Sequence, residues 1–142
     1  MSKPLSDDAK RLIDAPNIAH LTTLMEDGWP KAEPVWIGRD GDRIIVCTDR
    51  RSIKGKNIDR DPRVALSITD FDNPYEQLLI RGRVVEARDD GDLKIMDVLS
   101  HKYINAPFPR RKWPSRVAYY VEADVARYYL SPLKHTPPEK TS

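Results

Sequence analysis

A basic segment between residues 48 and 64, TDRRSIKGKNIDRDPRV, holds residue types that bind a phosphate group. Ser52 is placed where a short helix is expected to begin. The free backbone N–H groups and partial positive charge of a helix start favour an anion. Lys54 and Asn57 are one turn apart on the same helical face and offer an ammonium and an amide group. Gly55 between them allows a backbone or a ligand to approach closely. Together these residues predict a seat for one phosphate.

The same segment has a second interpretation, as a solvated turn that binds no ligand. Asp49, Asp59 and Asp61 lie among the cations and can neutralise them. The spacing also lacks the specificity of a Walker-type phosphate-binding loop. The residues alone leave both interpretations open.

Side chains suited to acid–base, nucleophilic or metal chemistry show no comparable grouping. His20, His101 and His135 are scattered, with no pair at the spacing of metal ligands. Cys47 lies in an apolar strand pattern and is typical of a small buried side chain. We therefore assign no catalytic residue and expect no metal site. Chemistry supplied by a bound cofactor fits this pattern, because the protein then provides only a positioned, dry pocket.

Alternating apolar and polar residues predict a mainly β domain that positions these groups. Asp27-Gly28 and Asp40-Gly41 are tight-turn signals between the first three strands, which we expect to form a meander. Gly82 predicts a bulge or bend in the long fifth strand. Helices are expected from Ser6 to the stop at Pro16, after Ser52, and over 89–104. The expected strands cover 18–25, 30–38, 43–48, 63–70, 75–88 and 116–130, with an irregularity near 122–124. Six mostly hairpin-linked strands favour a closed or partly closed antiparallel barrel.

Length and composition narrow the functional classes. The 142 residues predict one domain over 1–130 and a polar, proline-containing tail over 131–142 that we expect to be disordered. A formal net charge of +2 gives no overall field toward nucleic acid or acidic membranes. The charged N-terminus is unlike a signal peptide, and no apolar run approaches a membrane span. With a single cysteine, this composition favours a cytoplasmic protein.

Several stretches also carry a family resemblance. SIKGKNIDRDPRVAL after IIVCT, together with LTTLMEDGWPKAEPVWI and NPYEQLLIRGRVVEA, resembles the pyridoxamine-phosphate-oxidase-like split β-barrel flavoproteins over residues 15–130. PVWI, TDRRSIKGKNIDRDPRVAL and DNPY…IRGRV are most similar to the branch that uses a deazaflavin coenzyme of the F420 type. The resemblance implies a six-stranded, Greek-key split β-barrel with small flanking helices. It also implies a homodimer that holds two cofactors in grooves between its subunits.

The resemblance assigns roles residue by residue. The cofactor phosphate would be held by Ser52, Lys54 and Asn57. The ribityl chain would lie along Thr48, Asp49, Arg50 and Arg51. The flat ring would be lined by Ala32, Glu33, Pro34, Val35 and Trp36. The partner subunit would close the pocket with Tyr75, Arg110, Arg111, Lys112 and Trp113. The cations of residues 110–112 would attract the polyglutamate tail of a deazaflavin coenzyme, which flavin mononucleotide (FMN) lacks.

Two departures from the family pattern shape the expected activity. Relatives often have arginine where this chain has Ser52 or Ile53, which leaves Lys54, with Arg50 or Arg51, to carry the charge. The chain also lacks the arginine- and tryptophan-containing motif with which genuine pyridoxamine phosphate oxidases hold their substrate. Oxidation of pyridoxamine phosphate is therefore not the expected reaction.

We expect an oxidoreductase in which reduced deazaflavin delivers hydride to a small organic acceptor such as a quinone, tetrapyrrole or enone. The main alternative is the same fold with FMN, acting as a reductase or an oxidase. A second alternative is a small β-barrel that binds nucleic acid, against which the low net charge argues. A cofactor carrier or sensor without turnover would share every binding feature.

Overall fold

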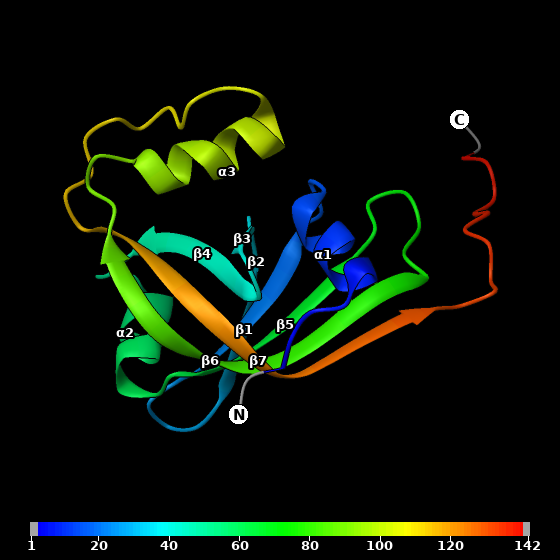
Figure 1. The fold of residues 1–142 in the computed structure, drawn as a ribbon, viewed down its shortest axis with the longest axis horizontal. Helices are drawn as coiled ribbons and strands as arrows, with labels where there is room; N and C mark the ends of the chain where they lie inside the picture. The colour runs from blue at the N-terminus through cyan, green and yellow to red at the C-terminus, as the bar shows by residue number, and fades with distance from the viewer. Residues whose placement is uncertain (1–2, 141–142) are drawn as a thin grey trace.

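The computed structural model describes residues 3–140, and Figure 1 shows its helices and strands. The elements are α1 (Asp7–Asp14), β1 (Ala19–Leu24), β2 (Pro30–Val35), β3 (Gly38–Asp40), β4 (Arg43–Asp49), α2 (Ile53–Arg60), β5 (Arg63–Thr69), β6 (Glu76–Asp89), α3 (Lys94–Ile104) and β7 (Arg116–Leu130). Within the described residues the strands form one antiparallel sheet of seven. The prediction of a mainly β, antiparallel split-barrel class with small helices is confirmed.

The two edges of the sheet are joined directly by the chain. The strand order is β2-β1-β5-β6-β7-β4-β3, so the consecutive strands β2 and β3 lie at opposite edges. Residues 36 and 37 alone separate these two strands in sequence. A connection this short requires the sheet to curl until its edges come near each other, which gives an open, split barrel.

The expected single strand over 30–38 was wrong, and so was the meander of the first three strands. Backbone groups at the break bond to α3 instead of continuing a strand ladder. Ile37 is fully buried, its N–H donates to Tyr103 Oη at 3.2 Å, and its carbonyl accepts from Lys102 Nζ at 2.6 Å. Because these bonds satisfy the backbone at the crossover, the predicted strand divides and the sheet has seven strands instead of six.

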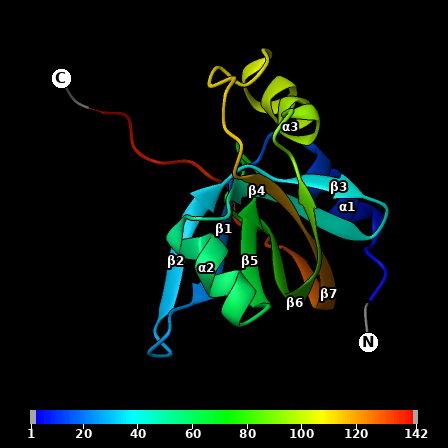
Figure 2. The ribbon, with the colours of Figure 1, turned by 90° about the vertical axis from the view of Figure 1, so that its left-hand side faces the viewer.

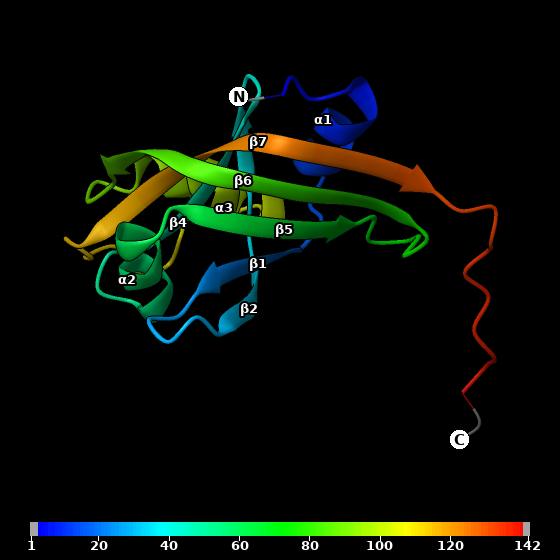
Figure 3. The ribbon, with the colours of Figure 1, turned by 90° about the horizontal axis from the view of Figure 1, so that it is seen from below.

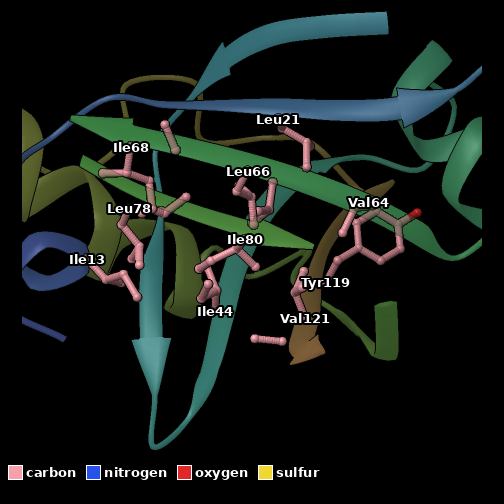
Figure 4. Packing of buried hydrophobic residues seen from close by; sticks show 14 of the residues in the cluster. Ile13, Leu21, Ile44, Val64, Leu66, Ile68, Leu78, Ile80, Tyr119 and Val121 are labelled. Atoms are coloured by element: carbon pink, nitrogen blue, oxygen red, sulfur yellow. The ribbon is translucent and has the colours of Figure 1, made fainter. Parts of the chain in front are cut away.

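The core lies inside the curled sheet. Figure 4 shows Leu66 and Ile68 of β5 and Leu78 and Ile80 of β6 on this inner face, with Ile44 of β4 among them. All five side chains are nearly or fully buried. Burial of one such side chain contributes about 1.5–3 kcal/mol, so the period-two alternation of β5 determines which face of the sheet turns inward.

The sharp bend of the β6–β7 pair depends on Gly82, as predicted. The register shifts between Arg81 and Gly82, which makes Asp124 the extra residue on β7. A Cβ atom on Gly82 would lie 2.1 Å from the carbonyl oxygen of Glu122, a distance that no side chain allows. The irregularity expected near 122–124 is therefore a bulge within a continuous strand.

Serine side chains begin the first two helices, as their sequence positions predicted. Ser6 Oγ accepts a hydrogen bond from the N–H of Ala9 at 3.1 Å, and Ser52 Oγ accepts from that of Gly55 at 3.1 Å. Each hydroxyl satisfies one helix-start N–H group that has no partner within the helix. Ser52 thereby determines where β4 gives way to α2.

The third helix starts later than the predicted range of 89–104. Asp90 is buried, and its two carboxylate oxygens accept from the N–H groups of Ile95 and Met96, both at 2.9 Å. This carboxylate caps the helix from outside, so residues 90–93 form a turn and α3 begins at Lys94. Figures 1 and 2 show α3 and the following loop over the β4 side of the sheet.

The C-terminal segment after β7 contains no helix or strand as far as residue 140. Figure 3 shows it extending away from the sheet. Its N–H at Ser131 donates to the carbonyl of Tyr75 at 3.0 Å. The division at residue 130 and the disorder of the tail stay predictions, and residues 141–142 lie outside the described part. No helix among residues 3–140 is long and apolar enough to cross a bilayer.

Candidate functional site

A cavity of about 500 Å³ opens where the ends of β2 and β4 and the start of α2 meet α3 and the loop of residues 105–115. Eight residues that the resemblance assigned to cofactor binding line it: Pro34, Val35, Trp36, Thr48, Asp49, Ser52, Lys54 and Trp113. The other lining residues are Ile18, Cys47, Met96, Leu99, Phe108 and Arg116. Its size lies within the range of pockets that enclose ring-bearing small molecules.

Aromatic rings form much of the wall. Trp36 stacks on Tyr103 of α3 with ring centroids 5.3 Å apart and nearly parallel planes. Phe108 meets the edge of Trp36 at 6.2 Å and stacks on Trp113 at 5.9 Å. These rings come from the β2–β3 crossover, from α3 and from the loop before β7, so the wall exists only in the folded chain. Flat apolar walls of this kind suit a flat ring system.

Two anchors hold α3 and its loop over the cavity. Lys102 Nζ donates to the carbonyls of Ile13 at 2.7 Å and Ile37 at 2.6 Å, which ties α3 to α1 and to the β2–β3 crossover. Burial lowers the pKa of Lys102 to about 8. Farther along, Asp97 accepts from both terminal nitrogens of Arg111, at 2.8 and 3.0 Å, and from the N–H of Phe108. The bonds from Arg111 hold the pKa of Asp97 below its ordinary value.

At the junction of β4 and α2, Asp49 joins the basic segment to the loop before β7. Its Oδ1 accepts from the N–H of Arg51 at 2.8 Å, and its Oδ2 accepts from the indole N–H of Trp113 at 2.6 Å. These bonds, led by the backbone N–H, hold the pKa of Asp49 well below its usual range. Asp49 is thus an ionised residue that positions an aromatic wall of the cavity.

The hydroxyl proposed for phosphate contact at Ser52 already has partners in the fold. Ser52 Oγ donates to the carbonyl of Asp49 at 2.6 Å while it accepts from Gly55. A Cβ atom on Gly55 would lie 2.7 Å from the carbonyl oxygens of both Asp49 and Arg50, so this glycine is required by the backbone itself. Ser52 lines the cavity, and its hydroxyl first of all shapes the junction.

Lys54 is the cation of the basic segment that lines the cavity. Its side chain is 18% exposed, and Nζ lies 3.6 Å from Glu33 Oε1. Glu33 also lies 3.1 Å from Lys31 Nζ, so one carboxylate is shared between two ammonium groups. Lys56, two residues along the same helix, is exposed to solvent. Lys54 therefore presents a compact positive charge at the cavity wall.

The remaining members of the predicted phosphate and ribityl set lie outside the cavity lining. Asn57 is buried and turns inward, where its amide donates to Thr23 Oγ1 at 3.0 Å and accepts from Arg60. Arg50 lies 3.3 Å from Asp89, and the largely exposed Arg51 folds back onto Asp49. Asn57 thus ties α2 to β1.

The residues predicted to line the cofactor ring, and those predicted to act in the partner subunit, also fall partly inside and partly outside the cavity lining. Ala32 and Glu33 of β2 do not line the cavity, whereas the three residues after them do. Arg110 lies over the Trp113 ring at 3.9 Å, and Lys112 is exposed. Tyr75 belongs to the β5–β6 connection, on the side of the molecule opposite α2 (Figures 1 and 3). A contribution of residues 75 and 110–113 to a partner's pocket stays a prediction.

Arg116 and Phe108 are cavity residues that the sequence reasoning missed. Arg116 opens β7, and strand alternation places it on the face of Ala118 and Tyr120, which pack as a buried cluster. An arginine at the start of an alternating apolar run was the available signal. Phe108 had none, because proline-rich loops show no periodicity. Cys47 lines the same cavity, and burial raises the pKa of its thiol to about 12, which keeps it protonated at neutral pH.

Comparisons with known proteins agree with this architecture. An F420 reductase is 27% identical, with a TM-score of 0.79 over 87% of this chain and 98% of that chain. A conserved hypothetical protein from Mycobacterium tuberculosis shares 19% identity, with a TM-score of 0.76 over 96% and 94% of the two chains. General Stress Protein 26 from Bacillus anthracis shares 19%, with a TM-score of 0.67 over 87% and 92%. The last two likenesses show the fold alone.

A sequence comparison with curated proteins gave no match. The sequence model of the family described as Pyridoxamine 5'-phosphate oxidase matches residues 5–129, which include every element of the sheet up to the penultimate residue of β7. The chain therefore belongs to the pyridoxamine 5'-phosphate oxidase family.

Proposed function

We propose that this chain is a cytoplasmic oxidoreductase that binds a deazaflavin coenzyme of the F420 type in the aromatic cavity and reduces a small organic acceptor. The observation that carries the proposal is the cavity itself, about 500 Å³ with Trp36, Phe108 and Trp113 on its walls and Lys54 at its rim. Likeness to an F420 reductase over 87% of the chain adds support for the cofactor class.

The residues present fit such a group. A reduced deazaflavin supplies hydride, while the protein provides binding, orientation and a dry environment. Trp36 and Phe108 offer flat apolar surface to the ring, and Lys54 offers a charge-assisted bond to an anionic phosphate. The loop of residues 105–115, held by Asp97, forms one side of the cavity through Phe108 and Trp113. With its thiol protonated, Cys47 provides no nucleophile at neutral pH.

A second candidate is the same activity with FMN. The loop of residues 110–112 supplies the cations proposed for the coenzyme tail, and one of them, Arg111, is already paired with Asp97 at 2.8 Å. That pairing leaves Arg110 and Lys112 to attract a polyglutamate chain. FMN has no tail, so a weak binding site for the coenzyme tail favours FMN as the cofactor.

Nucleic acid binding receives less support from the same residues. In the basic segment, Arg51 lies against Asp49, and Arg63 pairs with Asp61 at 2.7 Å. These local pairs lower the positive charge that a phosphate backbone would meet. The arginines of the basic segment therefore fit its interpretation as a solvated turn, whereas Lys54 fits its interpretation as a phosphate seat.

The homodimer expected from the resemblance has a suitable surface on the outer face of β5, β6 and β7. Two hollows of about 480 and 340 Å³ lie there, and both include Arg81 and Val125. Leu79 and Tyr129 on these strands are 43% and 54% exposed. We propose that a second copy of the chain covers this face. Sedimentation of a single species at monomer mass at micromolar concentration would contradict it.

The cofactor assignment is tested by titrating F420 and FMN separately into the protein and following their fluorescence. We expect saturable binding of F420. Lys54→Met should weaken it by at least about tenfold, since a charge-assisted bond contributes about 1.5–3 kcal/mol. Lys56→Met is the matched control, because the exposed Lys56 has the same charge on the same helix. Tighter binding of FMN would select the second candidate, and no saturation with either cofactor would contradict both.

A further inference from the structure

Arg116 is a buried cation that the proposed cofactor contacts do not use. It is 4% exposed and lines the aromatic cavity. Its Nε and Nη2 atoms are fully buried and have no hydrogen-bond partner within residues 3–140. Buried donors without partners are rare in folded proteins, and each loses its hydration without compensation.

The carboxylates near Arg116 bond to other donors. Asp90 accepts from the N–H groups of Ile95 and Met96 through its two oxygens. Asp49 accepts from the indole of Trp113 and from a backbone N–H. Both influence Arg116 through space, yet neither receives one of its two buried donors.

Aromatic rings hold the guanidinium by its face. Arg116 Cζ lies 4.2 Å from the centroid of the Trp113 ring and 5.5 Å from that of Phe108. Such cation–π contacts orient the plane of the guanidinium and offset part of its desolvation. They do not satisfy the buried N–H groups on Nε and Nη2, which still lack an acceptor.

The same edge binds carboxylates elsewhere in this chain. Arg39 places Nε and Nη2 on the two oxygens of Asp14 at 2.8 and 2.6 Å. Arg83 does the same with Asp124 at 3.0 and 2.9 Å. Two parallel bonds to adjacent acceptor atoms are the preferred geometry of this edge.

We propose that Arg116 is the recognition residue of the cavity for a flat, ring-bearing molecule with two adjacent acceptor atoms, as in an aromatic carboxylate. Two sources offer this chemistry: the carboxylate of a small aromatic acid, as acceptor substrate, and the nitrogen-and-carbonyl edge of a flavin-type ring. Only the second source rests on the proposed function. In either case Arg116 supplies two bonds to one edge of the occupant, and the rings of Phe108 and Trp113 pack beside it.

The test uses the full chain and two probes without phosphate, 2-naphthoate for the carboxylate and riboflavin for the ring edge. Binding is measured by calorimetry for wild type, Arg116→Met and Arg116→Lys. We expect at least one probe to bind about 10- to 100-fold more weakly to Arg116→Met. Arg116→Lys should also bind more weakly than wild type, because lysine keeps the charge and loses the planar fork.

Lys94→Met serves as the matched control, since this lysine carries the same charge on α3 with a side chain that is 85% exposed. It should bind both probes as wild type does. Binding of 2-naphthoate that depends on Arg116, in a protein that binds neither F420 nor FMN, would contradict the proposed function alone. F420 binding together with equal probe affinity in wild type and Arg116→Met would contradict this inference alone.

Melting of the free protein distinguishes recognition from a structural role. Arg116→Met should melt at or above the wild-type temperature without ligand, because the substitution removes a buried charge with unsatisfied donors. It should lose the rise in melting temperature that the probe produces in the wild type. Equal affinity of wild type and Arg116→Met for both probes would overturn the proposal. So would unfolding of Arg116→Met combined with wild-type affinity in Arg116→Lys.

Discussion

The two basic stretches of the chain, residues 49–63 and residues 110–116, differ in how their cations are neutralised. In the first, Arg51 and Arg63 fold back on the carboxylates two residues before them. In the second, Arg111 pairs with the distant Asp97, and the guanidinium edge of Arg116 finds no acceptor among the described residues. The segment that contains its own aspartates is thus the better neutralised one.

This difference shows that the number of charges does not locate a binding site. An exposed arginine beside an aspartate two residues away needs little from the fold, and such surface pairs contribute little to stability. A buried arginine must find acceptors, and among the described residues none accepts from Nε or Nη2 of Arg116, while Asp49 and Asp90 bond to other groups. The unmet hydrogen-bonding capacity marks the site.

The largest effect is expected from the carboxylate that caps α3. Asp90→Ala removes two buried bonds to the N–H groups of Ile95 and Met96, so we expect the free energy of unfolding to fall by about 2–4 kcal/mol in urea titrations. Asp89→Ala is the control, because the neighbouring side chain is 88% exposed. It should leave the midpoint unchanged.

A double-mutant cycle between Asp90→Ala and Arg116→Met sharpens the comparison. If Asp90 acts through the helix amides alone, the two changes should be additive to within about 0.5 kcal/mol. A coupling energy well above that value would show that Asp90 neutralises Arg116, and the contrast between the two basic stretches would no longer hold.

A smaller effect is expected for Asp49, which joins the two basic stretches. Asp49 and Asp61 each accept from the N–H of the residue two positions on, and only Asp49 also receives the indole of Trp113. Asp49→Ala should therefore lower the free energy of unfolding by about 1–3 kcal/mol more than Asp61→Ala does. Equal losses would mean that the bond to Trp113 contributes nothing. Tryptophan emission should shift in Asp49→Ala alone.

The smallest effect concerns Lys102, a partly buried cation that does have acceptors. Its pKa in the folded protein is lowered by burial to about 8, from an ordinary value of 10.5. Between these pH values the unfolded chain binds more protons, so the contribution of Lys102 to stability rises with pH. The free energy of unfolding of the wild type, relative to that of Lys102→Met, should increase from pH 8 to pH 10. Parallel stability curves over that range would contradict the lowered pKa.

Local features of the fold were predictable from the sequence. Ser6 and Ser52 begin helices because their hydroxyls reach a backbone N–H three residues on. The alternation of β5 and the bend at Gly82 follow from side-chain periodicity and from the absence of a Cβ atom. The division of β2 from β3 was not predictable, because Lys102, in a distant helix, satisfies the backbone at the break.

The candidate site was predictable to about the same extent. Trp36 and Lys54 were assigned to the cofactor and do line the cavity. Asn57 was assigned with Lys54 on helical spacing, and it turns instead toward Thr23, because β1 packs against α2 on that side. Phe108 lines the cavity from a loop that the bond from its N–H to Asp97 ties to α3.

The sequence by itself determined the helix starts, the inward faces of the strands, the ion pairs between residues two apart and the family of the chain. These depend on residues close together along the chain or on a linear pattern. The tertiary structure alone decided which cation remains without acceptors. Each carboxylate near Arg116 has several possible donors, and only the folded arrangement of α3, β4 and the loop of residues 105–115 settles that competition.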